Sequence, residues 1–468
     1  MEYLERVKKY RRDIYILGKK VEKEKFFEHP NIKPTIKAIA KTYEVGKKYY
    51  VDGINLLNKE IKNSDELIKR YEYQRELSLR LATCNYRCTG CDAINSLSPA
   101  TKALDEKLGT DYHSRFRKLL REIQKDDLAC TAALTDPKGE RGKRPVEQPE
   151  MFLRVVERKT GGVVVSGAKV HQSGAFAADV NFFMPTPYFL VLEKHKALTK
   201  DEEPFAVAFA ILPEDKGVKY VLQNTGIQAK QREGGRFEYG NPYGDRTTCM
   251  IILDNVFVPE DRVFGIEDLD VMRETLSNFA VSHRCVSAAC KAGFLDGIAG
   301  AASLMIKANG LSDVPTVQQK LLEIIAAAEL SFSAAIGAAV KGFDARGVWM
   351  PNPLTANAAK FYGVEMFNKA ILNLIDISGG IVGTSISEFD LKGEIGDKVG
   401  KYLRTTINAE ERLKLVKFIE YWLMSSHLVG AVHGGGAPTA ALTLLKYLTN
   451  IKEKENIIKD LLCLEILE

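Results

Sequence analysis

The chain has 468 residues, of which 45% are hydrophobic and 27% charged, a composition typical of a folded protein of two or three domains rather than a disordered one. Its 66 basic and 61 acidic residues are spread along the chain without a long block of like charge, so a nucleic-acid partner is not expected. No leader with a basic and then an apolar stretch is recognised, and charges interrupt the longest apolar runs; we therefore predict a cytoplasmic protein without a membrane partner.

Three regions with different patterns follow one another along the chain. In residues 1–140 apolar side chains recur at helical spacing, which predicts an N-terminal helical domain. Residues 141–272 contain short β-rich runs separated by glycine and proline, which predicts a middle β-domain. Residues 273–468 are rich in alanine, leucine and isoleucine, with breaks at glycine and proline, and predict a bundle of about four or five helices, each of roughly 20 or more residues.

A cluster of cysteines stands out within the first region. Three of the eight cysteines lie between Cys84 and Cys91, and in a reducing compartment such a cluster favours metal or redox chemistry over disulfides. If the stretch were helical, Cys84, Cys88 and Cys91 would share one face. Three thiols on one face suit a metal or iron–sulfur centre whose fourth ligand comes from elsewhere.

His283 is the best candidate for that fourth ligand. Of the seven histidines, only His283 lies on a predicted bundle helix close to further cysteines, Cys285 and Cys290. His283 and Cys290 project from nearly the same face but lie roughly 10 Å apart along a straight helix, which suits a four-iron cluster better than a single zinc ion. The alternative is that these side chains only pack in the bundle, but the cysteine cluster needs partners and favours ligation.

Three motifs of the sequence suggest other functions. The Cys84-x3-Cys88-x2-Cys91 spacing also occurs in radical S-adenosylmethionine enzymes, but the alternating strands and helices of their barrel are not predicted here. The stretch 433–436 is similar to the oxyanion loop of some esterases, yet the chain has no G-x-S-x-G motif to supply a nucleophile. The glycines from 379 to 383 lack the strand–turn–helix context of a dinucleotide-binding loop.

Ordered blocks over nearly the whole chain resemble the 4-hydroxybutyryl-CoA dehydratases, in the group that includes the flavin-dependent 4-hydroxyphenylacetate 3-hydroxylases and shares the acyl-CoA dehydrogenase fold. The blocks are Cys84-x3-Cys88, Met151–Glu157, Gly167–Gly174, Met184–Thr186, Asp254–Phe264, His283-x6-Cys290-Lys291, Ile377–Gly380 and His433–Pro438. The hydroxylases lack the cysteine and histidine set, so the chain resembles the dehydratases more.

The resemblance implies an α+β, acyl-CoA dehydrogenase-like fold, assembled as a homotetramer with FAD between subunits. It also implies one [4Fe-4S] cluster, with Cys91 not a ligand. The implied cluster ligands are Cys84, Cys88, His283 and Cys290. The implied FAD contacts are His171, Gln172, Ser173 and Gly174 at the flavin ring, Thr186 along the same cofactor, and Gly379 and Gly380 at the FAD of a neighbouring subunit.

The activity that the resemblance implies is removal of water from a small hydroxyacyl-CoA or a related hydroxy compound. The hydrogen at C3 is not acidic enough for an ordinary side-chain base, so flavin radical chemistry would acidify it and iron would act as a Lewis acid on the departing hydroxyl. The catalytic candidates matched by the same blocks are Lys291, His433, Arg75 and Arg87.

The chain departs from the dehydratases at three acid/base positions. Ser287 replaces a tyrosine between the histidine and cysteine ligands, and Thr248 and Gly430 replace two glutamates. A serine hydroxyl is a poor substitute for a phenol, because its pKa is far higher. We therefore do not predict 4-hydroxybutyryl-CoA as the substrate. Tyr86, beside the ligands, is a candidate replacement for the phenol, although packing is the simpler explanation.

Two other functions follow if these losses are given more weight. The chain would be a flavin-dependent monooxygenase or oxidoreductase acting on an aromatic or acyl substrate, with a vestigial or structural metal site. Alternatively, the loss of three polar residues would leave a non-catalytic oligomeric flavoprotein.

Overall fold

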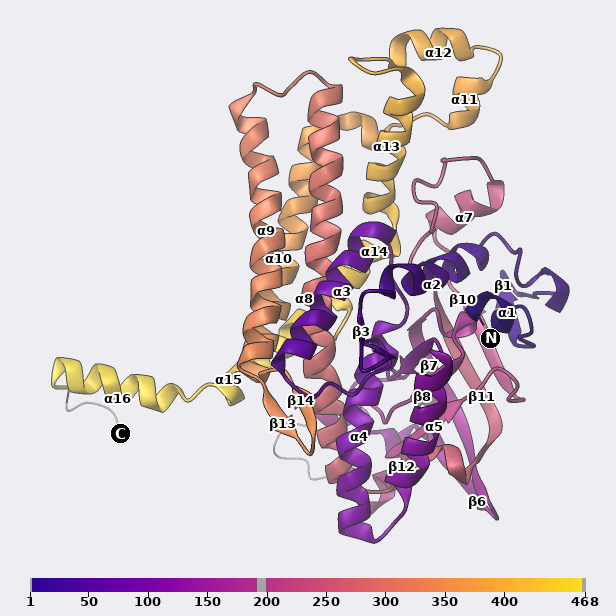
Figure 1. The fold of residues 1–468 in the computed structure, drawn as a ribbon, viewed down its shortest axis with the longest axis vertical. Coiled ribbons are helices and arrows are strands. Elements are labelled where there is room, and N and C mark those ends of the chain that lie inside the picture. Colours follow the sequence, from indigo (N-terminus) through magenta and orange to yellow (C-terminus); the bar gives the residue numbers. More distant parts are fainter. Residues whose placement is uncertain (1, 192–198, 465–468) are drawn as a thin grey trace.

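The computed structural model describes residues 2–191 and 199–464, and Figure 1 shows a β-rich part packed beside an elongated helical bundle. The helices of the N-terminal region are α1 (Tyr3–Val7), α2 (Lys33–Gly46), α3 (Ser64–Leu81), α4 (Cys88–Leu108) and α5 (Tyr112–Asp126). Two short helices, α6 (Tyr188–Val191) and α7 (Gly226–Glu233), lie in the β-rich part.

Two sheets form the β-rich part. The larger has the strand order β2 (Lys19–Lys20), β1 (Asp13–Ile16), β10 (Val218–Leu222), β11 (Thr248–Pro259), β7 (Gly162–Ser173) and β6 (Arg154–Lys159). The smaller has the order β12 (Val263–Ile266), β9 (Val207–Ile211), β8 (Val180–Phe183) and β5 (Cys130–Ala133). Two hairpins complete the strands, β3 (Tyr50–Val51) with β4 (Ile54–Asn55) and β13 (Phe343–Ala345) with β14 (Val348–Met350).

The sequence of a helical start, a β-rich middle and a helical end agrees with the prediction, but residues 1–140 also contribute strands. Strand β1 pairs in parallel with β10, and β5 pairs in parallel with β8. Strand β5 is buried at all four positions, so it lacks the alternation that marks a half-buried strand. Both strands depend on partners far along the chain, which local periodicity does not reveal. The boundaries at residues 140 and 272 stay predictions.

The bundle contains three long helices rather than four or five. They are α8 (Leu269–Ala308), α9 (Pro315–Val340) and α10 (Pro353–Ser378). The shorter helices that follow are α11 (Glu388–Lys392), α12 (Gly396–Leu403), α13 (Ala409–Met424), α14 (Ser426–His433), α15 (Pro438–Leu448) and α16 (Ile451–Leu462). Breaks fall where glycine and proline predicted them: Asn352 caps α10, with its side chain accepting a hydrogen bond from the Thr355 N–H, and Gly379 ends it with φ 71°.

By length and composition alone, three helical stretches of the described chain are apolar enough to cross a membrane: α8, α9 and the segment 426–448. In the fold, the apolar window of α8 is 67% buried, whereas that of segment 426–448 is 11% buried. The apolar character of α8 is therefore largely explained by the bundle core. Segment 426–448 leaves apolar surface exposed, and the absence of a membrane partner stays a prediction.

Helices α3 and α8 approach each other closely at one glycine, which sets the distance across which the candidate site is built. A Cβ atom added to Gly293 on α8 would lie 2.0 Å from the backbone oxygen of Arg75 on α3. The Gly293→Ala substitution should therefore push the two helices apart and lower the free energy of unfolding by about 1–3 kcal/mol. Gly297→Ala, one turn later, is the matched control, because its added Cβ would meet only Leu79 at 3.9 Å. Urea unfolding of both variants checks this, and equal effects would contradict it.

Candidate active site

The cysteine cluster is divided between a turn and a helix. Helix α3 ends before Ala82, which has a left-handed φ of 47°, and α4 begins at Cys88. Cys84 therefore lies in the turn between the two helices, and only Cys88 and Cys91 lie on α4. The stretch is therefore not one continuous helix, and the three thiols do not share one helical face, because Cys84 lies outside α4.

The turn nevertheless brings Cys84 and Cys88 together. The two thiols lie close enough to act on each other's pKa. The Cys88 thiol, the positive charge of Arg246 and the backbone N–H of Tyr86 lower the pKa of Cys84, against the effect of burial. The N–H of Tyr86 lies 3.3 Å from Cys84 Sγ. The proximity of Cys84, together with burial, raises the pKa of Cys88 well above its usual value. Cys84 is thus the thiol that most readily becomes a thiolate, the form that binds metals.

Cys290 joins this pair from α8. Burial raises its pKa to about 12, and Cys84 is close enough to act on the same pKa electrostatically. Cys290 Sγ lies 3.6 Å from the side-chain oxygen of Gln74 on α3. The side-chain nitrogen of Gln74 is buried and has no hydrogen-bond partner in the described part of the chain. An amide N–H group next to the Cys290 thiol, with no acceptor of its own, suits donation to a thiolate or a cluster sulfur.

His283 is oriented by a buried carboxylate. Its Nδ1 lies 2.8 Å from Asp92 Oδ2, and the Asp92 carboxylate is fully buried and also accepts from Arg70 at 2.8 Å and from Ser282 at 2.6 Å. With Nδ1 held by the carboxylate, Nε2 is the ring nitrogen left for a ligand. A metal-binding histidine is commonly held by a carboxylate in this way. Asp92 was not singled out from the sequence.

The four predicted ligands do not converge on one point. Among residues 2–191 and 199–464, no three or more His, Cys, Asp or Glu side chains are grouped closely enough to hold a single metal ion. The three thiols and the imidazole come instead from a turn and from two helices. This separation does not suit a mononuclear zinc site, and soft sulfur donors around a wider centre suit an iron–sulfur cluster.

Cys91 is engaged elsewhere. Its sulfur accepts a hydrogen bond from Arg70 at 3.1 Å and lies 3.4 Å from the backbone oxygen of Leu56. Burial raises its pKa to about 11. Cys91 thus packs on the side of α4 that faces Arg70, in keeping with its exclusion from the ligand set.

Lys291 is buried next to Cys290 and contacts the position where the dehydratases carry tyrosine. Its ammonium donates to the Ser287 hydroxyl at 2.7 Å, and burial lowers its pKa to about 8. The group that can exchange a proton at this position is therefore an ammonium rather than a phenol.

Lys360 on α10 is a second buried lysine at the site, and the sequence did not reveal it. Its ammonium donates to the backbone oxygens of Val432 at 2.7 Å and Gly434 at 2.6 Å, at the end of α14. Burial, followed by the positive charges of Lys291, Arg284 and Arg246, lowers its pKa to about 6. Basic side chains therefore surround Lys360 on this side of the site.

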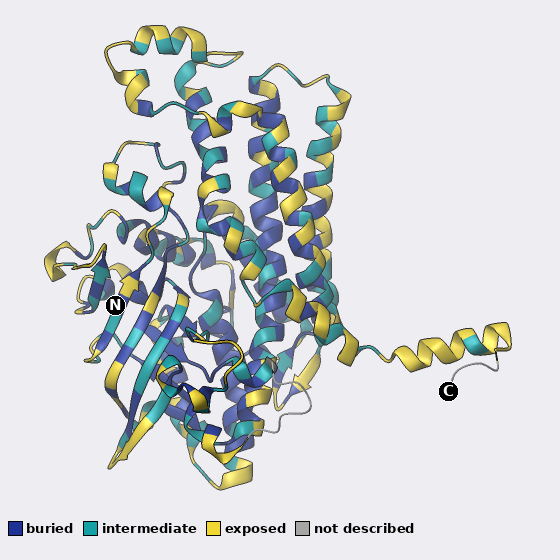
Figure 2. Ribbon diagram, turned by 180° about the vertical axis from the view of Figure 1, so that it is seen from behind, coloured by how far each residue is buried: buried dark blue, intermediate teal, exposed yellow. Residues whose placement is uncertain are grey.

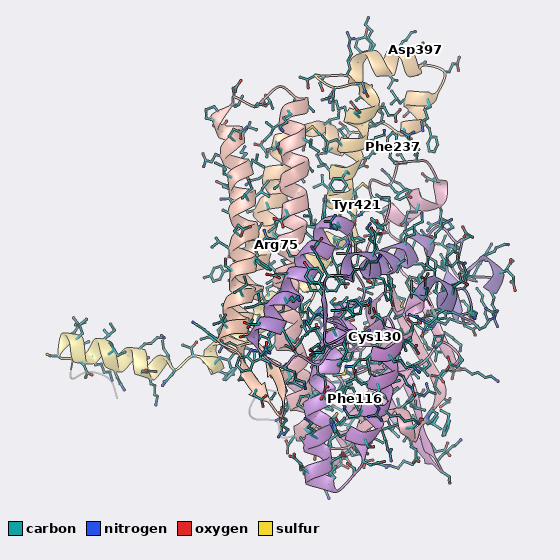
Figure 3. All side chains as sticks on the ribbon, in the orientation of Figure 1. Arg75, Phe116, Cys130, Phe237, Asp397 and Tyr421 are labelled. Atoms are coloured by element: carbon teal, nitrogen blue, oxygen red, sulfur yellow. The ribbon has the colours of Figure 1, made fainter. Side chains whose placement is uncertain are left out.

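The structure does not bring Arg75 and Arg87 to the cysteines as catalytic groups. Arg75 on α3 faces helices α8 and α9 (Figure 3), where it pairs with Asp296 at 2.7 Å and with Glu329. Arg87 is fully buried and pairs with Asp127 at 2.6 Å. Carboxylates elsewhere in the chain neutralise both guanidinium groups, and a catalytic role for Arg75 and Arg87 stays a prediction.

The segment expected to face the flavin ring ends strand β7. Ser173 lies opposite Thr248 in the β7–β11 ladder, so one of the lost acid/base positions is adjacent to this segment. His171 has a left-handed φ of 63°, and burial, Lys138, Arg246 and His433 lower its pKa. His433, which is exposed at the end of α14, is thus brought near the flavin-facing segment.

Tyr86 packs rather than replacing the lost phenol. Its hydroxyl donates to the backbone oxygen of Asp245 at 3.0 Å and accepts from the Thr247 N–H at 3.2 Å. Its ring covers Gly174, where an added Cβ would lie 2.5 Å from the ring. Burial raises its pKa far above the usual value. The ring instead fixes the flavin-facing segment against the cysteine turn.

The other predicted FAD contacts lie in different surroundings. Gln172 is buried, and its backbone oxygen accepts a hydrogen bond from the Cys249 thiol at 3.3 Å. The hydroxyl of Thr186, also buried, accepts from the N–H of Tyr188 at 3.2 Å. Gly379 and Gly380 are exposed at the far end of α10, roughly 27 Å along the helix from Lys360. They lie far from the cysteines of their own chain.

Solved structures first define the class of protein. The chain has the acyl-CoA dehydrogenase-like fold: an acyl-CoA dehydrogenase from Slackia heliotrinireducens has a TM-score of 0.53 at 14% identity, covering 91% of this chain and 98% of that one. The oxygenase component (HpaB) of 4-hydroxyphenylacetate 3-monooxygenase, complexed with FAD, has a TM-score of 0.84 at 21% identity, covering 98% and 97%. The predicted fold class is confirmed.

The chain belongs to the 4-hydroxyphenylacetate 3-hydroxylase family, whose N-terminal part matches residues 1–265 and whose C-terminal part matches residues 272–463. The 4-hydroxybutyryl-CoA dehydratase/vinylacetyl-CoA-Δ-isomerase of Clostridium aminobutyricum is 32% identical over 98% of each chain. An oxygen-tolerant archaeal 4-hydroxybutyryl-CoA dehydratase from N. maritimus has a TM-score of 0.93 at 30% identity, covering 100% of this chain and 95% of that one. An oxygenase component of 4-hydroxyphenylacetate 3-monooxygenase from Thermus thermophilus is 27% identical over 73% of this chain and 69% of its own. The predicted family resemblance is confirmed.

Proposed function

We propose that the chain is a dehydratase-type enzyme that binds FAD and one [4Fe-4S] cluster and removes water from a hydroxyacyl-CoA or a related hydroxy compound. The cluster ligands would be Cys84, Cys88, His283 and Cys290. The similarity to 4-hydroxybutyryl-CoA dehydratases supports the reaction class, and an FAD complex of a protein with the same fold supports the flavin.

One observation carries this proposal. Cys84 and Cys88 lie close enough to act on each other's pKa, Cys290 acts on both from a helix some two hundred residues later, and His283 on that helix is held through Nδ1 by Asp92. Buried cysteines that only fill a core need no such arrangement, and a histidine that only packs needs no buried carboxylate.

The chain's own residues would hold the substrate and move its protons. When bound, the flavin and the cluster would supply one-electron chemistry and a Lewis-acidic iron. Lys291, next to Cys290, is able to exchange a proton near neutral pH, because its pKa is lowered to about 8. His433 is exposed beside the flavin-facing segment.

The surroundings of the three altered positions support a substrate other than 4-hydroxybutyryl-CoA. The Ser287 hydroxyl accepts from Lys291, and the Thr248 hydroxyl donates to Gln223. At Gly430 an added Cβ would lie 2.2 Å from the guanidinium of Arg246, so a cation fills the space beside this position. The proton-transfer groups of the dehydratases have therefore been replaced, and the substrate should differ accordingly.

Cofactor analysis of the purified protein tests the proposal. Anaerobically purified chain should contain about four irons and a similar amount of acid-labile sulfide, with one FAD. Iron-free protein that keeps its flavin would contradict the cluster and would favour the second candidate below.

The second candidate is a flavin-dependent monooxygenase, favoured by the loss of the acid/base residues at positions 248, 287 and 430. The Thermus thermophilus relative is an oxygenase component of this kind. This candidate predicts that the chain with reduced flavin and oxygen hydroxylates a phenolic substrate such as 4-hydroxyphenylacetate. Product analysis with that compound separates the two functions.

We further propose a homotetramer, because large apolar side chains remain exposed along the bundle. They include Leu322 and Leu330 on α9, Tyr362 and Leu372 on α10, and Val429 and Tyr447 in segment 426–448. Helix α16 projects from the body and has no buried residue along its length (Figure 2). Apolar surface on this scale is usually covered by a partner, and copies of this chain are the partners that we propose.

A further inference from the structure

Four basic side chains gather beside the cysteines and the flavin-facing segment. This basic cluster consists of Arg246, Arg284, Lys291 and Lys360. The positive charge of Arg246 lowers the pKa of Cys84 and the pKa of His171. Arg284 lies against the glycine loop after α14, and a Cβ added to Gly435 would meet both Arg284 and His283.

The hydrogen bonds of the cluster lead only to neutral acceptors. Lys291 donates to a serine hydroxyl and Lys360 to backbone oxygens. Arg284 donates to the backbone oxygen of Gly435 at 3.2 Å and to the side-chain oxygen of Asn357. The Nε of Arg246 is buried without a hydrogen-bond partner in the described ranges. In those ranges none of the four forms an ion pair with a carboxylate.

Such an arrangement is costly unless an anion completes it. Arg284, Lys291 and Lys360 are 4%, 2% and 1% exposed, and buried charges are normally paired. Two other buried cations of the chain, Arg70 and Lys169, pair with the carboxylates of Asp92 and Asp136. The thiolates of the proposed cluster would offset part of the charge near Cys84, but they would leave the cations on the α10 and α14 side without partners.

The position of Arg246 indicates where the missing charge belongs. The guanidinium of Arg246 lies against Gly430 on α14, where an added Cβ would lie 2.2 Å from it. Position 430 therefore offers this cation no carboxylate, and a ligand is the available source of the negative charge.

We propose that the acyl part of the substrate carries a second, free carboxylate, which binds to Arg246, Arg284 and Lys360. This inference rests on the proposed function, since it names the substrate class of the same site. Guanidinium groups bind carboxylates in a bidentate manner, and a lysine adds a further charge-assisted hydrogen bond.

Binding of matched thioesters to the flavin-loaded protein tests the proposal. Under anaerobic conditions, succinyl-CoA and glutaryl-CoA should perturb the flavin absorbance at concentrations about tenfold or more below those needed for butyryl-CoA. Arg246→Gln and Lys360→Met should reduce this preference to about twofold or less. Lys369→Met, on the exposed face of the same helix α10, is the matched control and should keep the preference.

Three results would separate the possible failures. Equal binding of all three thioesters to the unaltered protein, or a preference that survives both substitutions, overturns the carboxylate site. A loss of FAD affinity in Arg246→Gln and Lys360→Met, with the thioester preference intact, also overturns it and assigns the cations to the cofactor's phosphates. If no thioester binds but free glutarate perturbs the flavin through Arg246, the carboxylate site stands and the thioester part of the proposed function is wrong.

Discussion

Replacing Cys84, Cys88 or Cys290 with serine should remove most of the iron from anaerobically purified protein, from about four per chain to below about one. Each of these thiols touches or acts electrostatically on another member of the set, so no neighbouring cysteine can take its place without moving a helix. Flavin content should change little, because these substitutions leave the β7 segment intact. Iron, acid-labile sulfide and flavin assays on the same samples measure the effect.

Two buried cysteines provide matched controls for this experiment. Cys91→Ser changes a thiol of α4, the helix that carries Cys88, and this thiol accepts a hydrogen bond from Arg70. Cys285→Ser changes a fully buried thiol of α8, the helix that carries Cys290. Both variants should keep their iron. If Cys91→Ser lost the iron while His283→Ala kept it, the radical S-adenosylmethionine spacing would be the correct interpretation of the motif.

The predicted ligand set rests on two local signals, the spacing of the cysteines and the histidine and the resemblance to known blocks. Cys84 with Cys88, and His283 with Cys290, each lie within one or two helical turns. Their orienting groups are different, because Asp92 acts through a contact between α4 and α8 that no local pattern shows. A lone carboxylate within the apolar start of α4 was the available signal. Lys360, between Ala359 and Phe361, was a similar one.

Arg75 and Arg87 show the opposite limit of sequence-based prediction. Both occupy block positions beside the ligands, but their charges are neutralised by Asp296, Glu329 and Asp127. Those carboxylates are distant in the sequence for Arg75 and lie at the end of another helix for Arg87. Whether a cation serves the site or the fold depends on its ion-pair partners, and only the three-dimensional structure supplies them.

Asp92 should have the largest single effect on both stability and cofactor retention. Asp92→Ala leaves the buried guanidinium of Arg70 without its carboxylate, and breaking a buried ion pair from one side costs about 3–5 kcal/mol. The same change removes the acceptor that fixes His283 Nδ1 at 2.8 Å, so the ring can turn and iron retention should fall. Urea unfolding of iron-free protein and iron analysis of anaerobic protein measure the two effects. Glu106→Gln, at an exposed position of the same helix, should change neither.

A double variant distinguishes the structural role of Asp92 from its role in positioning His283. Asp92→Leu combined with Arg70→Met replaces the ion pair with apolar side chains, a change that often restores the stability lost in a one-sided substitution. We expect the unfolding free energy to recover by at least about half, while iron retention stays low, because Nδ1 of His283 still lacks its acceptor. If iron returned together with stability, Asp92 would serve only the fold, and His283 would be oriented by its stacking on Phe279.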